Sequence, residues 1–447
     1  MSTPQGSAAF ERARRGERAL LIQPYPPGQV DPALLEEFTE LARSAGATIV
    51  GTITARVERA NAATYIGSGK VEEVQSAVAA TGADLVLVNH ALSPAQERNL
   101  ERALKLRVVD RTGLILDIFA QRAATHEGKL QVELAQLKHW QTRLVRGWTH
   151  LERQRGGAIG LRGPGETQLE MDKRILQRKI ESLQSRLDKV EVQRTQMRRA
   201  RNRNAVPRVA LVGYTNAGKS TLFNALTGSG VYADDRLFAT LDPTVRRVEG
   251  VAPLVLSDTV GFVRDLPHEL VAAFRSTLAE AREADLLLHV VDAADELRDE
   301  RIRQVDAVLE EIGAGDIPQV LVFNKIDRIE GAEARVDAEV EGRARVWVSA
   351  RDRLGLDLLL DLLQRRFQEH RFTGELVLGP ADGRLRARLH DAGAVRAERV
   401  DAEGHSVLDI DLALAAAERL AAEAGGHPLQ ALLLVTPDAP TYNPDTD

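Results

Sequence analysis

Apolar residues in the first hundred positions fall into short runs, separated by segments with helical spacing. The runs are rich in β-branched residues and predict strands at residues 19–23, 47–54 and 84–89. Amphipathic patterns predict helices between and after them at residues 32–44, 71–80 and 94–104. Strands that alternate with helices are typical of α/β structure, so we expect an N-terminal α/β domain over residues 18–112.

A longer helical pattern with apolar residues three, four or seven positions apart covers residues 113–205. Its first half carries Leu130, Leu134, Leu137, Leu144, Trp148 and Leu151. Its second half, from residue 168 to about 201, carries Leu176, Ile180, Leu183, Leu187, Val190 and Met197. This spacing predicts an antiparallel coiled-coil hairpin. The tip loop between the two helices, residues 153–168, contains five glycines, which oppose regular structure.

Alternating strand and helix patterns return over residues 206–372 and predict a mostly parallel sheet flanked by helices. Residues 373–436 predict a small C-terminal α+β domain, with a helix at 411–424 and strands at 375–378, 384–389, 407–410 and 432–435. The polar ends, residues 1–17 and 437–447, predict disordered tails. The fold class expected from the whole pattern is therefore multidomain α/β.

Composition narrows the class of protein. The chain has 447 residues, of which 44% are hydrophobic, and no cysteine, which excludes disulfides, thiolate metal sites and a cysteine nucleophile. No apolar run approaches the roughly 20 residues that span a bilayer, and the first residues lack the apolar core of a secretory signal. We expect a cytoplasmic protein, and a monomer.

Charge is distributed unevenly. Residues 138–203 hold 17 basic and 7 acidic residues, although the chain as a whole has a formal charge of −6. Such a segment is either a solvated helical hairpin or a contact for a polyanion, for which nucleic acid is the obvious candidate. Arginine matches phosphate geometry, so Arg153, Arg155 and Arg162 of the tip loop are the candidate RNA-binding residues.

The strongest chemical signal is the segment 213–220, GYTNAGKS, which follows an apolar strand and precedes a helical pattern. This spacing matches a phosphate-binding P-loop, in which backbone N–H groups surround an anion. Gly213 and Gly218 allow close approach of the backbone, Lys219 is expected to reach the β and γ phosphates, and Ser220 to bind Mg²⁺.

Two further segments are suited to sensing the γ phosphate. The segment 238–244, FATLDPT, resembles a mobile switch that supplies a threonine to Mg²⁺; Thr240 is the preferred candidate and Thr244 the alternative. Asp258, at the end of a second apolar strand, can hold Mg²⁺ through water, and the N–H of Gly261 can contact the γ phosphate.

Residues 324–327, NKID, lie at the end of another apolar strand and indicate which base the bound nucleotide carries. Asp327 can accept hydrogen bonds from guanine N1–H and the exocyclic amine together, a pair that adenine does not present. Lys325 can cover the base, Asn324 can join this loop to the P-loop, and the segment that starts at Ser349 can direct an N–H at guanine O6. The substrate expected from this combination is GTP.

The candidate residues of the predicted GTP site fall into three groups, which bind the nucleotide, bind Mg²⁺ or take part in catalysis. Those for the nucleotide are Gly213, Tyr214, Thr215, Asn216, Ala217, Gly218, Lys219, Ser220, Thr221, Phe238, Ala239, Thr240, Leu241, Asp242, Asp258, Thr259, Val260, Gly261, Asn324, Lys325, Ile326, Asp327, Ser349, Ala350 and Arg351. Those for Mg²⁺ are Ser220, Thr240 and Asp258. Those for catalysis are Asn216, Lys219, Thr240 and Gly261.

These motifs resemble those of the TRAFAC GTPases, and the chain as a whole resembles the HflX family of ribosome-associated GTPases. The resemblance rests on GYTNAGKS, FATLDPT, DTVGF and NKID, and outside them on YIGSGK at 65–70 and RGPGETQLE at 162–170. It implies an N-terminal α/β domain, a helical linker and a P-loop GTPase domain. It also implies binding to the large ribosomal subunit and its rRNA, and splitting or rescue of stalled ribosomes under stress.

Two features of the sequence bear on how fast GTP is hydrolysed. Phe262 stands where Ras-like enzymes carry the glutamine that positions water, so we expect slow intrinsic turnover. Asn216 matches the asparagine that coordinates K⁺ in potassium-activated relatives, so K⁺ is a candidate cofactor; in the alternative, Asn216 only stabilises the loop.

Other functions stay open at this point. One is a GTP-gated ribosome-binding scaffold with little hydrolysis. Another is an ATP-driven RNA remodeller that uses the segment 67–70, GSGK, of the N-terminal domain. That segment lacks the first glycine and the final Ser or Thr of a P-loop, and we interpret it as a turn.

Overall fold

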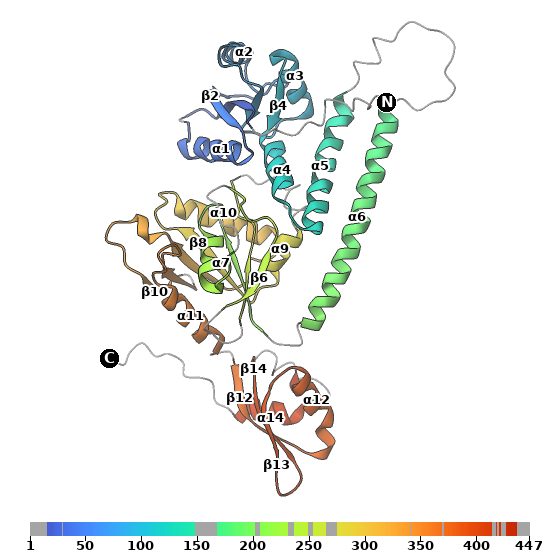
Figure 1. Ribbon diagram of the computed structural model, residues 1–447, viewed down its shortest axis with the longest axis vertical. Coiled ribbons are helices and arrows are strands. Elements are labelled where there is room, and N and C mark those ends of the chain that lie inside the picture. The colour runs from blue at the N-terminus through green and yellow to red at the C-terminus, as the bar shows by residue number, and fades with distance from the viewer. Residues whose placement is uncertain are drawn as a thin grey trace, which may run out of the picture.

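The computed structural model describes residues 16–28, 30–147, 168–201, 206–230, 237–248, 254–264, 275–340, 342–368, 371–413, 417, 420–421 and 426–435. The described strands form three sheets that follow one another along the chain (Figure 1). The α/β class expected from the sequence is confirmed. None of the described helices has the length and apolar content that crossing a membrane requires.

The first sheet is parallel and has the strand order β2-β1-β3-β4. Its elements are β1 (Arg18–Tyr25), α1 (Pro32–Ser44), β2 (Thr48–Arg56), α2 (Ser68–Thr81), β3 (Leu85–Val88), α3 (Pro94–Leu104) and β4 (Arg107–Asp110). Alternate residues of β1 face opposite layers: Leu21 packs with α1, and Leu20 packs with α2 and α3. The three predicted strands and helices are confirmed, and β4 is an additional strand of four residues, too short to give a periodic pattern.

The helical linker contains α4 (Arg111–Arg122), α5 (His126–Gly147) and α6 (Gln168–Arg201). The helices α5 and α6 lie side by side (Figure 1), and their shared apolar seam comprises Leu130, Leu134, Leu137, Leu176, Ile180 and Leu183. The predicted hairpin pairing is therefore confirmed over this part. Trp148, Leu151 and the tip-loop arginines Arg153, Arg155 and Arg162 lie outside the described residues.

The second sheet has the order β10-β11-β9-β8-β5-β7-β6, and only its two edge strands are antiparallel to their neighbours. Its strands are β5 (Arg208–Gly213), β6 (Thr244–Arg247), β7 (Val255–Asp258), β8 (Leu286–Asp292), β9 (Gln319–Asn324), β10 (Arg335–Val340) and β11 (Arg343–Trp347). Its α-helices are α7 (Lys219–Thr227), α9 (Arg275–Arg282), α10 (Arg298–Glu311) and α11 (Leu356–Gln368). The buried strands β5, β8 and β9 carry near-continuous apolar runs, which is why the sequence revealed them.

The third sheet is antiparallel, with the order β12-β14-β13, and corrects part of the prediction. Its elements are β12 (Arg371–Leu378), α12 (Gly383–Asp391), β13 (Val395–Val400), β14 (Ser406–Ala413) and α14 (His427–Val435). The strands predicted at 384–389 and 432–435 are wrong, because both segments are helical. Leu385 and Leu389 fit either period, and short apolar runs do not separate strand from buried helix. The strand β13 was missed because most of its residues are exposed and several are charged.

One hydrophobic core joins the first two sheets. It contains Leu21 and Phe38 from the N-terminal sheet layer, Phe119 from α4, and Val212 and Phe238 from the second sheet region. The same core contains Tyr214, Val260 and Phe262, which follow β5 and β7, so α4 belongs to the core that borders the carboxyl ends of these strands. The sequence motifs described above gather at the same ends.

Candidate active site

At two positions of the loop between β5 and α7, the backbone has a conformation that only glycine fits. Gly213 and Gly218 have φ of +141° and +92°, and a Cβ would overlap the Val290 carbonyl oxygen at the first and the Asn324 side chain at the second. The loop therefore folds tightly against β8 and β9. The loop leads into the N-terminus of α7, and the N-terminus of a helix is suited to binding an anion.

Lys219 is buried within this loop. Its Nζ donates to the carbonyl oxygens of Gly213 at 3.1 Å and Tyr214 at 2.8 Å. Burial lowers the pKa of Lys219, the Asp258 charge opposes this shift and the Lys325 charge adds to it, so that the pKa is about 8. A phosphate in the loop would favour the charged ammonium form.

Three oxygen-bearing side chains meet beside the loop. Ser220 Oγ lies 2.8 Å from both Thr240 Oγ1 and Asp258 Oδ2, and Thr240 Oγ1 lies 2.9 Å from the same Asp258 oxygen. Burial raises the pKa of Asp258, and its Oδ1 is buried without a hydrogen-bond partner among the described residues. Two hydroxyls and a buried carboxylate form a donor set that fits Mg²⁺. Thr244, the alternative threonine, begins β6 instead.

The segment after β7 packs directly on the P-loop. A Cβ at Gly261 would lie 2.9 Å from Lys219 Nζ and 2.8 Å from Thr215 Cγ2, so this glycine keeps the space between them open. Thr215 N donates to Phe262 O at 2.7 Å, and Thr259 Oγ1 donates to Leu211 O at 2.6 Å. The Phe262 side chain is buried in the shared core, so it does not face the phosphate space.

The loop after β9 is joined to the P-loop and to the loop after β11. Asn324 Nδ2 donates to Ala217 O at 2.9 Å, and Ala350 N donates to Asn324 Oδ1 at 2.9 Å. Ser349 Oγ donates to Asp327 Oδ1 at 2.7 Å, which orients that carboxylate. Ile326 is buried beneath the loop, and Arg351 is exposed beside it. The predicted guanine-reading residues are thus brought together at one edge of the sheet.

The segment 237–242 divides its side chains between two regions. Thr240 faces Ser220, as described, whereas Phe238 and Leu241 are buried in the shared core. Asp242 accepts hydrogen bonds from Ala124 N at 2.8 Å, from Thr125 N at 2.9 Å and from the Thr125 hydroxyl. The carboxylate of this sequence candidate therefore binds the linker rather than the P-loop.

The sequence did not reveal a polar network that links the P-loop to the N-terminal domain. The Tyr214 hydroxyl donates to Glu37, which also accepts from the Arg111 guanidinium. Arg264 N donates to Tyr214 Oη at 2.7 Å, and Arg111 donates to Arg264 O at 2.7 Å. Burial, and then the Glu37 charge, raise the pKa of Tyr214. These residues are far apart in the chain, so no local motif marks them.

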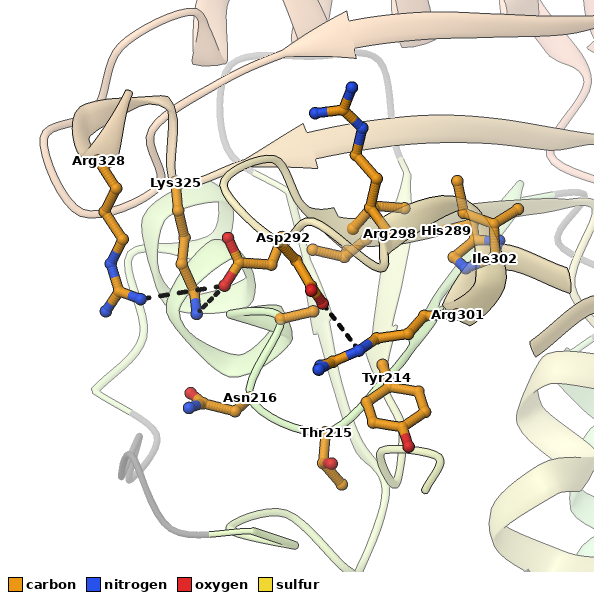
Figure 2. Close-up of a pocket in the computed structure, with 14 residues that line it drawn as sticks. Tyr214, Thr215, Asn216, His289, Asp292, Arg298, Arg301, Ile302, Lys325 and Arg328 are labelled. Carbon is orange, nitrogen blue, oxygen red and sulfur yellow. Dashed lines mark hydrogen bonds and ion pairs between the residues drawn. The ribbon is translucent and has the colours of Figure 1, made fainter. Parts of the chain in front are cut away.

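A pocket beside the P-loop contains further residues that the sequence analysis missed. Figure 2 shows Arg301 reaching across Tyr214, with its guanidinium carbon 4.7 Å from the ring centroid. Lys325 Nζ lies 2.7 Å from Asp292 Oδ2 at the end of β8. Asn216, with φ of +59°, lines the same pocket, and its side chain points away from Arg301 (Figure 2).

The combination of a P-loop, a threonine and aspartate beside it, and a guanine-reading loop on a mostly parallel sheet defines a P-loop GTPase. Comparison with known proteins agrees. Residues 33–120 match the family model described as GTP-binding GTPase N-terminal, and residues 122–201 match GTP-binding GTPase Middle Region. Residues 208–325 match the family described as 50S ribosome-binding GTPase.

Individual relatives narrow the class to one family. GTPase HflX of Escherichia coli strain K12 is 54% identical over 414 residues, which cover 92% of this chain and 97% of the relative. GTPase HflX of Magnetococcus marinus is 46% identical over 420 residues, which cover 93% and 96%. A solved GTP-binding protein from Sulfolobus solfataricus in complex with GDP is 25% identical, covers 78% of this chain and 97% of its own, and has a TM-score of 0.43. The chain belongs to the HflX family of GTPases, and it binds and hydrolyses GTP.

Proposed function

We propose that this GTPase docks on the large ribosomal subunit through rRNA and splits or rescues stalled ribosomes under stress, as a cytoplasmic monomer. The observation that carries the proposal is that a strongly basic helical hairpin begins beside the GTPase site. Residues 138–203 hold 17 basic and 7 acidic residues, and the start of α5 contacts the segment that contains Thr240. The match to a family described as 50S ribosome-binding GTPase supports the same partner.

The proposed roles of the site residues follow from their geometry. Ser220, Thr240 and Asp258 would hold Mg²⁺, which when bound offsets negative charge on the phosphates. Asp258 Oδ1, which is buried and has no hydrogen-bond partner in the part of the chain that the structure describes, supports this assignment. Lys219 binds the β and γ phosphates, and Gly261 N–H contacts the γ phosphate. Asp327, oriented by Ser349, selects guanine.

Hydrolysis by the isolated protein is proposed to be slow, because Phe262 is buried and has no group that can orient water. We propose that K⁺ bound near Asn216 accelerates the reaction. The rate of GTP hydrolysis in K⁺ should exceed that in Na⁺, and Asn216→Ala should remove the difference. Equal rates in the two salts would leave Asn216 as a residue that only stabilises the loop.

The ribosome proposal is tested with the tip-loop arginines. Replacing Arg153, Arg155 and Arg162 by Ala should weaken binding to large subunits and reduce the slope of log affinity against log salt by about 2, because phosphate contacts release counterions. Intrinsic hydrolysis should stay near normal. A matched control removes Arg384, Arg386 and Arg388 from α12, where the same loss of charge should leave subunit binding unchanged.

Two outcomes would contradict the proposal. Normal subunit binding by the tip-loop variant would remove the hairpin from the interface. Loss of intrinsic hydrolysis with intact binding would show instead that the loop serves the GTPase domain. Co-sedimentation with large subunits at several salt concentrations, in the presence of a non-hydrolysable GTP analogue, measures both affinity and slope.

A further inference from the structure

The two residues that lead into α5 bind a carboxylate from a distant part of the chain. The first amides of a helix have no partner within the helix and favour a negative charge. Here Ala124 N and Thr125 N donate to Asp242 Oδ2 at 2.8 and 2.9 Å, and the Thr125 hydroxyl donates to Asp242 Oδ1. Asp242 therefore holds the two residues that lead into α5, although it lies 117 residues after Thr125 in sequence.

A glycine on α5 makes room for this carboxylate. Gly128 lies in the first turn of the helix, where glycine is normally unfavourable, and a Cβ at this position would overlap Asp242 Oδ1. Its N–H donates to Thr125 Oγ1 at 3.0 Å, which directs the hydroxyl hydrogen toward Asp242. Gly128 thus leaves room for the Asp242 carboxylate, and Thr125 donates a hydrogen bond to it.

The other end of the switch segment is fixed to the same region. Phe238 packs edge-on against Phe119 of α4, with ring centroids 4.6 Å apart and planes at 75°. Leu237 N donates to Ser44 Oγ of α1 at 3.0 Å. Phe238 also has φ of +57°, a conformation that a bulky side chain adopts only where its surroundings impose it.

Thr240 lies between these two anchors. Its hydroxyl is the group of the segment that reaches Ser220 and Asp258, at 2.8 and 2.9 Å. Because the residues on both sides are attached to α1, α4 and α5, the position of Thr240 depends on helices outside the GTPase sheet.

We propose that Asp242 is a positioning residue for GTP hydrolysis: held by the start of α5, it sets Thr240 against Ser220 and Asp258. The inference rests on the proposed role of Thr240 in holding Mg²⁺. Since α5 leads into the basic tip loop, a partner that displaces the hairpin also displaces Thr240. This contact therefore connects the hairpin to the GTPase site.

The experiment disturbs the contact from both sides and measures the Mg²⁺ dependence of single-turnover GTP hydrolysis. Gly128→Ala, which pushes the carboxylate away, and Asp242→Ala, which removes it, should each raise the half-saturating Mg²⁺ concentration about five- to tenfold. GDP affinity should not change, because Thr240 is expected to matter only with the γ phosphate. If Asp242→Ala does not fold, Thr125→Val removes the hydroxyl that donates to Asp242 and accepts from Gly128 N, and it should give a smaller shift in the same direction.

A second measurement needs no nucleotide. Hydrogen exchange at the amides of Ala124 and Thr125, and across residues 237–242, should become faster in both variants of the free protein. The matched control is Ser93→Ala, which removes the cap of α3 in the same domain, where Ser93 Oγ accepts from Gln96 N at 3.3 Å. It should alter neither the Mg²⁺ dependence nor the exchange of these residues.

A double-mutant cycle separates this inference from the proposed function. If Asp242 acts through Thr240, Gly128→Ala should cause no further shift in a Thr240→Ala background. If Thr240→Ala shifts the Mg²⁺ dependence while Gly128→Ala and Asp242→Ala do not, the inference is overturned and the metal role of Thr240 stands. If Thr240→Ala leaves the Mg²⁺ dependence unchanged, the metal role and the inference both fall.

Discussion

Two segments of this chain that contain glycine and lysine lie at the start of a helix, residues 67–70 for α2 and the P-loop for α7. Only the second has the compact backbone of a phosphate-binding loop. At 67–70, Gly67 and Gly69 have open space around them and Lys70 pairs with Glu73 of its own helix at 2.6 Å. In the P-loop, by contrast, Gly213 and Gly218 are pressed against neighbouring strands. Lys219 is buried, and its Nζ donates hydrogen bonds to carbonyl oxygens of its own loop. A phosphate loop thus requires a backbone folded onto itself, which the presence of glycine and lysine does not guarantee.

The asparagines at the carboxyl ends of β3 and β9 also differ in the part of the molecule that they contact. Asn89, after β3, donates to Gln23 Oε1 at 2.7 Å and accepts from Arg111 at 2.8 Å. Asn324, at the end of β9, connects the base-reading loop to Ala217 of the P-loop. Asn89 thus contacts Arg111 of the linker, whereas Asn324 contacts the P-loop.

The largest expected difference between the two segments concerns their lysines. Lys219→Ala should reduce GTP hydrolysis by about 100- to 1,000-fold, because a buried cation that meets the phosphates is lost. Lys70→Ala should leave hydrolysis unchanged, since its ammonium pairs with Glu73 at the surface. Single-turnover assays on both variants test this. A comparable loss in Lys70→Ala would bring the N-terminal segment into the nucleotide chemistry.

Base selection should also belong to the second sheet alone. Asp327→Asn should weaken GTP by about 100-fold and strengthen xanthosine triphosphate, whose C2 oxygen accepts from the new amide. Asp84→Asn is a control at the start of β3, where Asp84 accepts from Arg18 N at 2.9 Å, and it should change neither affinity. Competition binding with the two nucleotides measures the switch. Unchanged GTP affinity in Asp327→Asn would remove this residue from guanine recognition.

Alanine at the two glycine sites should change stability in opposite directions. Gly213→Ala should destabilise the GTPase domain by roughly 2–4 kcal/mol, because its Cβ would overlap the Val290 carbonyl and its φ is +141°. Gly69→Ala, at an open position in α2, should stabilise the N-terminal domain by about 0.5–1 kcal/mol. Calorimetric unfolding of both variants gives the two signs. Equal tolerance of alanine at both positions would show that the P-loop backbone is less constrained than its contacts imply.

A smaller effect is expected of pH on the free energy of unfolding, through His139 of α5, which lies where the N-terminal sheet meets the hairpin. Burial, and then the Arg143 charge, lower the pKa of His139 to about 4, while Asp110 opposes the shift. The unfolded chain takes up this proton near pH 6.5 and the folded protein only near 4, so stability is lost as the pH falls between these values. From pH 7.5 to 5, this one group should cost about 2 kcal/mol.

The variant His139→Gln isolates that contribution. Its thermal midpoint should fall less than that of the parent between pH 7.5 and 5. The comparison between the two proteins matters, because Glu97, whose pKa burial raises to about 7, works in the opposite direction in both. An equal fall in the two proteins would show that His139 is protonated without cost.

The sequence by itself determined the order of most elements and predicted the residues of the nucleotide site. Apolar runs at β5, β8 and β9 end in polar or glycine-containing motifs, and parallel strands bring such ends to one edge of a sheet. Phosphate and guanine recognition require particular residues at short spacing, so Lys219, Asp258 and Asp327 could be predicted from local pattern. The exposed strand β13 and the two C-terminal helices had no comparably clear pattern.

Only the tertiary structure decided how the site is connected to the rest of the molecule. Nothing near Asp242 in sequence indicates that its carboxylate binds the residues before α5, and the Tyr214 hydroxyl meets Glu37 across 177 residues of chain. Such contacts depend on two domains packing into one core, and the free energy of that packing comes from residues spread along both. A local sequence pattern reflects interactions between residues that are close in the chain. The partner of a side chain across a domain interface is set by the fold.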